Sequence, residues 1–138
     1  MAERTIITNY LFSQAGKFLA GSTVTSAPAA FTHLSLDGAD MSGLSTASTE
    51  LAGESTESGL GRTAATVTAA TTDCANDTLR LILQFTAGTP DVIYGAGISN
   101  SSTAEDATIS AFHEWAASVS FETDDKVTET INVQAKTD

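Results

Sequence analysis

The sequence has few of the residues that would brace a small chain covalently or let it bind nucleic acid. It contains one cysteine, Cys74, among 138 residues. No disulfide can therefore form within the chain, and no cysteine-based metal site can be built. Six lysine and arginine residues stand against 17 aspartate and glutamate residues, which gives a net charge of -11. A field of that sign repels phosphate backbones, so nucleic acid is excluded as the main partner.

Long apolar runs are also missing. No run approaches the roughly 18 apolar residues that a membrane-spanning helix needs. The segment from Met1 to Thr5 lacks the basic region and apolar stretch of a secretory signal. We therefore expect no membrane partner, and a protein that stays where it is made or travels as part of an assembly.

What the sequence does have favours one small β-rich domain. Its length fits a single domain over residues 1–138, and 41% of the residues are hydrophobic, enough for a core of its own. Threonine, serine, alanine and glycine are abundant, which suits short strands and turns better than long helices.

One stretch near the N-terminus shows helical spacing. Apolar side chains recur three and four residues apart at Ile7, Leu11, Ala15 and Phe18. Thr5 can cap the start, and Gly21 follows the last periodic residue. We expect a short amphipathic helix over residues 5–20, lying across a sheet.

After Pro28 the spacing of apolar residues changes to two, which is typical of strands. The clearest case is 78–86, where leucine and phenylalanine occupy one face and Thr78, Arg80, Ile82, Gln84 and Thr86 the other. Strands are expected over residues 31–36, 62–72, 78–86, 91–98, 107–121 and 126–135. With the main β region at 62–135, the pattern predicts an all-β fold, an antiparallel β-sandwich or jelly-roll-like domain with one short N-terminal helix.

Residues 41–61 have no clear periodicity and few bulky side chains. Leu44, Leu51 and Leu60 are the candidate anchors. A segment of this length without periodicity is usually functional or disordered. We interpret it as an extended loop or arm, and the three leucines as candidate interaction residues that could order against a neighbouring subunit.

The residues that could carry chemistry do not form a recognisable motif. His33 and His113 can be combined on paper with many serines and aspartates, but no G-x-S-x-G turn singles one out. The carboxylate pairs at 37/40 and 124/125 are ordinary turn residues. The stretch 59–64 fits the G-x-G-x-x-A pattern of nucleotide-binding sites. That pattern needs a strand before it and a helix after it, whereas here a loop precedes it and a threonine-rich strand follows. We predict no catalytic residues, no metal, no cofactor and no small-molecule substrate.

Several stretches, in order along the chain, resemble small structural proteins of tailed bacteriophages and related archaeal viruses, whose genes are labelled head decoration or tail-fibre-like. The matching stretches are Asn9–Leu11, Ala15–Lys17, Ala30–Gly38, Gly59–Thr68, Asn76–Leu81, Gln84–Ala87, Ile93–Tyr94, Ala96–Ile98 and Asn100. The departures are Gly95, where an acidic residue is usual, Ser99, where an aromatic residue is usual, and Ser101–Asp106 in place of a Gly-Gly turn.

The resemblance implies a virion structural protein rather than an enzyme. Its most direct form is a capsid decoration (cement) protein on the outer surface of the capsid, assembled in the host cytoplasm. Its partners would be the major capsid protein and copies of itself. A tail, baseplate or fibre-associated protein is the alternative. A carbohydrate-binding β-sandwich module is a further alternative, for which Tyr94, Trp115 and a few phenylalanines are available. In that case Trp115 would bind sugar instead of packing in the core.

Overall fold

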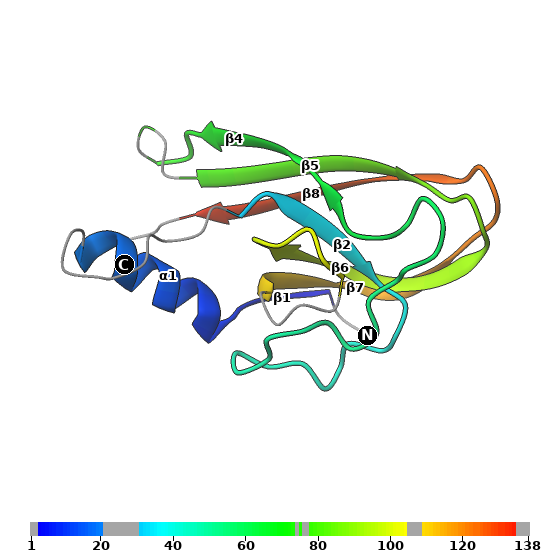
Figure 1. Ribbon diagram of the computed structural model, residues 1–138, viewed down its shortest axis with the longest axis horizontal. Helices are drawn as coiled ribbons and strands as arrows, with labels where there is room; N and C mark the ends of the chain where they lie inside the picture. Colours follow the sequence, from blue (N-terminus) through cyan, green and yellow to red (C-terminus); the bar gives the residue numbers. More distant parts are fainter. Residues whose placement is uncertain (1–2, 21–30, 74, 76–77, 105–108, 135–138) are drawn as a thin grey trace.

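The computed structural model describes residues 3–20, 31–73, 75, 78–104 and 109–134, with the backbone alone for residue 14 and residues 16–20 (Figure 1). The elements in this part of the chain are β1 (Arg4–Ile7), α1 (Asn9–Ala20), β2 (His33–Asp37), β3 (Thr63–Ala64), β4 (Thr66–Ala70), β5 (Thr78–Thr86), β6 (Asp91–Ser99), β7 (Ile109–Phe121) and β8 (Lys126–Gln134).

The strands form two antiparallel sheets. The large sheet has the order β1-β7-β6-β2-β3, and the small sheet has the order β4-β5-β8. The chain passes from one sheet to the other between β3 and β4, between β5 and β6, and again between β7 and β8. Backbone hydrogen bonds between Ala87 and both Asp124 and Asp125 join the β5–β6 connection to the β7–β8 connection. The predicted all-β sandwich with one short helix is confirmed.

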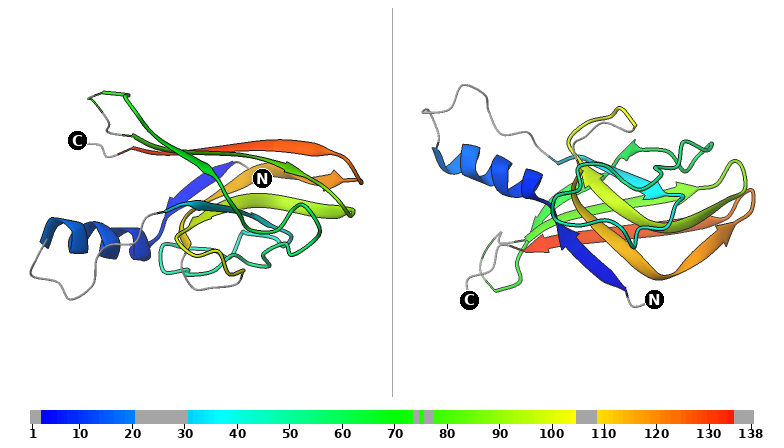
Figure 2. Two further views of the ribbon diagram at one scale, coloured as in Figure 1. Left: turned by 45° about the horizontal axis from the view of Figure 1, so that its top comes forward. Right: turned by 90° about the horizontal axis from the view of Figure 1, so that it is seen from below.

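The prediction of a helix over residues 5–20 was wrong at its start. Residues 4–7 form β1, which pairs with β7 from Arg4 opposite Glu114 to Ile7 opposite Ala111. Ile6 and Ile7 pack against different core clusters, the alternation of a strand, so the helix begins only at Asn9. The helix also does not lie across a sheet. It extends past the end of the sandwich (Figure 2), where Phe12 is 61% exposed.

The predicted strand boundaries needed two further corrections. The expected strand at 62–72 is divided into β3 and β4, which belong to different sheets with Ala65 between them. The β region is also wider than residues 62–135, because β1 and β2 supply two of the five strands of the large sheet.

The main core lies between the two sheets. Alternate residues of facing strands meet there, as the period of two predicts. Its fully buried members include Leu34 and Leu36 of β2, Leu81 of β5 and Ile93 of β6.

Most of residues 38–62 cover the other face of the large sheet, so the molecule has three layers; we call these residues the third layer. Leu60, near the end of this segment, instead packs into the core between the two sheets. On the covered face, Met41 and Leu51 form a second buried cluster with Ile109 and Phe112 of β7. The layer packs directly on the backbone of β6, because a Cβ atom added to Gly95 would lie 2.5 Å from the Met41 sulfur. Glycine in the middle of this strand thus makes room for the layer.

Candidate functional site

The leucines predicted to anchor an arm belong to the third layer. Leu60 has no exposed surface, and Leu51 is 8% exposed. Leu44 is half-buried and packs against the cluster around Met41. Residues 41–61 do form a loop, but the loop is folded onto its own large sheet. A neighbouring subunit could therefore touch neither Leu51 nor Leu60 while the layer stays in place.

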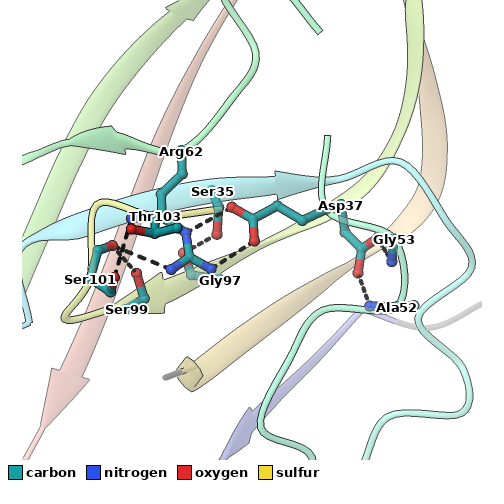
Figure 3. Close-up of polar contacts among 10 residues, drawn as sticks. Ser35, Asp37, Ala52, Gly53, Arg62, Gly97, Ser99, Ser101 and Thr103 are labelled. Carbon is teal, nitrogen blue, oxygen red and sulfur yellow. Dashed lines mark hydrogen bonds and ion pairs between the residues drawn. The ribbon is translucent and has the colours of Figure 1, made fainter. Parts of the chain in front are cut away.

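Asp37, at the end of β2, holds the third layer through backbone N–H groups (Figure 3). Its carboxylate accepts hydrogen bonds from Ala39 at 3.0 Å, Ala52 at 2.7 Å and Gly53 at 2.8 Å. The side chain is fully buried, and burial raises its pKa against the opposing effect of these hydrogen bonds. Asp37 also forms an isolated backbone bridge with Glu54, and its side chain satisfies the neighbouring donors that this single bridge does not reach.

A buried ion pair lies beside these hydrogen bonds (Figure 3). Arg62 and Glu54 have side chains that are 1% and 2% exposed, and two Arg62 nitrogens bind the Glu54 carboxylate at 2.6 and 2.7 Å. A further Arg62 nitrogen donates to the Ser101 carbonyl at 3.3 Å. Both charges are paired in a fork geometry, so removal of either side chain would leave the other charge buried without compensation.

The third layer also contains a hollow of about 360 Å³ lined by residues 50–54. Glu54 is committed to Arg62, and the hollow is otherwise lined by Glu50, Leu51, Ala52 and Gly53. Within the described part of the chain, no three histidine, cysteine, aspartate or glutamate residues are grouped so that they could hold a metal ion. The hollow therefore has no set of converging polar groups that would define a ligand site.

His113 joins the two sheets. Its Nδ1 lies 3.0 Å from Glu129 of β8, and its Nε2 lies 2.7 Å from Glu3. Burial acts to lower the pKa of His113, but the two carboxylates outweigh it and the pKa is raised above its ordinary value of 6.5. Burial raises the pKa of Glu129, against hydrogen bonds from His113 and Trp115. A protonated His113 that donates to both carboxylates therefore links β7 of the large sheet to β8 of the small sheet.

Neither histidine belongs to an arrangement typical of a hydrolase. Among the described residues, the hydrogen-bond partners of His113 are both carboxylates, and His33 Nδ1 lies 2.9 Å from the Thr32 hydroxyl. Nucleophilic catalysis needs a nucleophile, a base and an orienting acid in one chain of hydrogen bonds. The described contacts of the two histidines do not form such a chain.

The aromatic residues considered for sugar binding take part in packing. Trp115 is half-buried and packs against the core between the sheets. Tyr94 is half-buried beside the cluster of the third layer. Sugar sites on β-sandwiches commonly use exposed aromatic faces, and these two side chains do not supply one.

The open surface of the small sheet is the main candidate site; we call it the outer face. Side chains of β4, β5 and β8 alternate between the core and this face. Threonines and amides dominate it, and the register places them in rows: Thr130 lies beside Ile82, and Ile82 beside Thr66. The outer face consists of Thr66, Thr68, Ala70, Arg80, Ile82, Gln84, Thr86, Lys126, Thr128, Thr130, Asn132 and Gln134.

The charge of the outer face is opposite to that of the molecule. It carries Arg80 and Lys126 and no aspartate or glutamate. Arg80 donates to Asn132 across the strands at 2.9 Å. One carboxylate contacts the edge of this face: Asp73, in the connection between β4 and β5, accepts a hydrogen bond from the Gln134 side chain at 2.7 Å. In a chain of net charge -11, an exposed face without acidic side chains stands out.

Exposed acidic groups lie on several surfaces outside the outer face. Asp40 and Glu50 are exposed on the third layer, and Glu122, Asp124 and Asp125 are exposed in the connection between β7 and β8. The outer face therefore differs in charge from the surfaces around it. The sequence shows one strand of the outer face, because the alternation at 78–86 is plain. The rest of the face depends on which strands pair with β5.

A comparison with protein-family models, curated proteins and solved structures finds no significant match for this chain. Among the described helical residues, none form a helix of the length and apolarity required to cross a bilayer.

Proposed function

We propose that this chain is a virion structural protein, a capsid decoration (cement) protein that associates with copies of itself and with major capsid subunits on the outer shell. The observation that carries the proposal is the outer face, an exposed sheet surface without acidic side chains on a strongly acidic chain. The resemblance of several sequence stretches to small structural proteins of tailed phages supports it.

A protein that coats a shell in many copies must approach other copies closely. Copies that carry a charge of -11 repel one another. Contact then costs least where neither partner presents carboxylates, since like charges placed together in an interface cost several kcal/mol. The outer face supplies such a surface, and its threonine and amide groups can hydrogen-bond to a partner.

The third layer suits the solvent side of such an assembly. Its exposed residues include Asp40, Glu50 and Glu57, which are well solvated and keep particles apart by mutual repulsion. The orientation that follows places the outer face toward the shell and the third layer toward solvent.

The first test is the copy number of the chain relative to the major capsid protein in purified particles, measured by quantitative mass spectrometry. A ratio near one, or a simple fraction of one, is expected. A few copies per particle would replace the decoration role by the tail, baseplate or fibre alternative. Absence from particles would overturn a virion role altogether.

The second test asks whether the outer face makes the contact. Thr128→Glu/Thr130→Glu adds two negative charges there, and Thr46→Glu/Ala47→Glu adds the same charge at exposed positions of the third layer. We expect the first variant to lose binding to undecorated shells in a co-sedimentation assay, and the second to keep it. Equal binding by both variants would overturn the assignment of the outer face.

A further inference from the structure

The two sheets end in four edges, and three of them have features that discourage pairing with another chain. β1 has four residues and begins with Arg4, and β3 has two residues. β8 begins with Lys126 and turns the buried side chain of Glu129 inward. Short length, charge and inward-pointing charged residues are the means by which natural proteins protect a sheet edge.

The fourth edge, β4, has none of these features. Its sequence from Thr66 to Ala70 contains no charged residue, no proline and no glycine. Residues 66–69 are exposed, and Val67 is 39% exposed. Among the described strands, β4 pairs with β5 alone and lies at the border of the fold (Figures 1 and 2). Alternate residues of such a strand direct N–H and C=O groups outward.

We propose that β4 pairs antiparallel with β4 of a second copy of this chain, about a two-fold axis at Thr68. The two small sheets then form one sheet of strand order β8-β5-β4-β4-β5-β8. Val67 lies opposite Ala69 of the other copy, and Thr66 lies opposite Ala70. This inference rests on the proposed function, because it names the contact through which copies associate.

Charge selects a second copy as the occupant. Two chains of net charge -11 can approach only through surfaces that lack carboxylates. β4 is uncharged, and under the two-fold axis it meets only its own small or β-branched residues, so it is complementary to itself. The outer faces of both copies then continue as one surface free of acidic strand residues.

The edge is short, so we expect a weak and reversible dimer in solution that many contacts on a shell would reinforce. Sedimentation velocity of the full chain over a wide concentration range measures it. Val67→Lys places a charge on the edge, and we expect the dissociation constant to rise about tenfold or more. Thr130→Lys adds the same charge on the outer face away from β4, and we expect no change.

Cross-linking tests the register. In a Cys74→Ala background, Thr68→Cys places two cysteines directly opposite each other. Their Cα atoms would lie about 4.5–5.5 Å apart, as in an antiparallel pair, which is within the range that a disulfide spans. We expect a covalent dimer on mild oxidation, and none from Thr130→Cys in the same background. If Val67→Lys does not fold, judged by circular dichroism, the cross-link decides alone.

The two proposals fail in different ways. A chain that is monomeric at every concentration, and whose Thr68→Cys variant forms no cross-link, overturns the pairing of β4, whatever its copy number on particles. A dimer that Val67→Lys leaves unchanged also overturns it. If the chain dimerises through β4 but is absent from particles, the virion role is overturned. The proposed pairing of β4 with β4 is then still supported.

Discussion

The two sheets of this protein differ in how they are covered. The middle of the large sheet is buried on both faces, by the small sheet on one side and by the third layer on the other, while residues 116–120 of β7 are exposed. The small sheet is buried on one face and open on the other. The comparison shows that irregular chain covering a sheet is held partly by buried polar side chains, because its backbone bonds to the sheet at only a few positions, such as the bridge between Asp37 and Glu54.

The buried polar residues follow this difference. Asp37 and the Glu54–Arg62 pair lie where the third layer meets the large sheet. Thr8 is fully buried beside the same sheet and donates to carbonyls of β7. On the outer face of the small sheet water satisfies most side chains; Thr78, at the start of β5, is buried and hydrogen-bonds to the Thr72 hydroxyl at 2.7 Å. Glycine follows the same rule: it occurs in β6, under the third layer, and in no strand of the small sheet.

The largest expected effect comes from breaking the buried ion pair of the third layer. Arg62→Met leaves Glu54 buried without its partner, and we expect the free energy of unfolding to fall by about 3–5 kcal/mol. Chemical denaturation measures the change. The double variant Glu54→Leu/Arg62→Met should recover most of the loss, because replacement of a whole buried pair by apolar residues is close to neutral. A loss below about 1 kcal/mol in the single variant would contradict the role of the pair.

A matched pair of substitutions compares the two sheets directly. Thr8→Val removes a buried hydroxyl that donates to the carbonyls of Ile109 and Ser110 at 2.7 and 2.9 Å, and we expect a loss of about 1–3 kcal/mol. Thr130→Val makes the same chemical change on the outer face, where we expect less than about 0.5 kcal/mol. Thermal and chemical denaturation of both variants give the difference. Equal losses would mean that the outer face is buried in the protein as it exists in solution.

The smallest effect depends on pH and concerns the link between the sheets. The pKa of His113 is raised above 6.5, so its contribution to stability is complete below pH 6.5 and is lost as the pH rises through the raised value. The pKa of Glu129 is also raised, so its contribution to stability is complete below pH 4.5 and is lost as the pH rises through the raised value. We expect His113→Gln to cost about 1 kcal/mol near pH 6, the size of a partly exposed charged hydrogen bond.

That cost should shrink toward pH 9, where the histidine of the unchanged protein is neutral. Denaturation curves of the two proteins at pH 6 and pH 9 measure it. A difference of the same size at both values would show that the histidine acts through packing and not through its charge.

Much of the fold could be predicted because its strands alternate locally. The expected strand at 126–135 differs from β8 by one residue, and the expected strand at 91–98 differs from β6 by one. β1 was missed because the apolar residues at 7, 11, 15 and 18 also fit a helix, and because its pairing with β7 joins residues far apart in the sequence. Periodicity contains no information about such distant partners.

The candidate site was less accessible to prediction for the same reason. The leucines at 51 and 60 were singled out as candidate contacts to a neighbouring subunit, but in the structure they are buried within their own chain. Leu51 packs against β7 on one face of the large sheet, and Leu60 packs into the core between the sheets. The outer face becomes visible only when β4 and β8 are placed beside β5. The absence of acidic residues there is a property of three separate segments and of no single motif.

The lack of carboxylates on the strands of the outer face, with exposed acidic residues on other surfaces, makes the charge of the molecule uneven. A positively charged solid support, such as an anion-exchange resin or a coated sensor chip, would therefore hold the chain by its acidic surfaces and not by the threonine rows. Adsorption alone would favour the orientations that leave these rows turned toward the liquid. The face that we assign to the shell would then be open to any partner passed over the support.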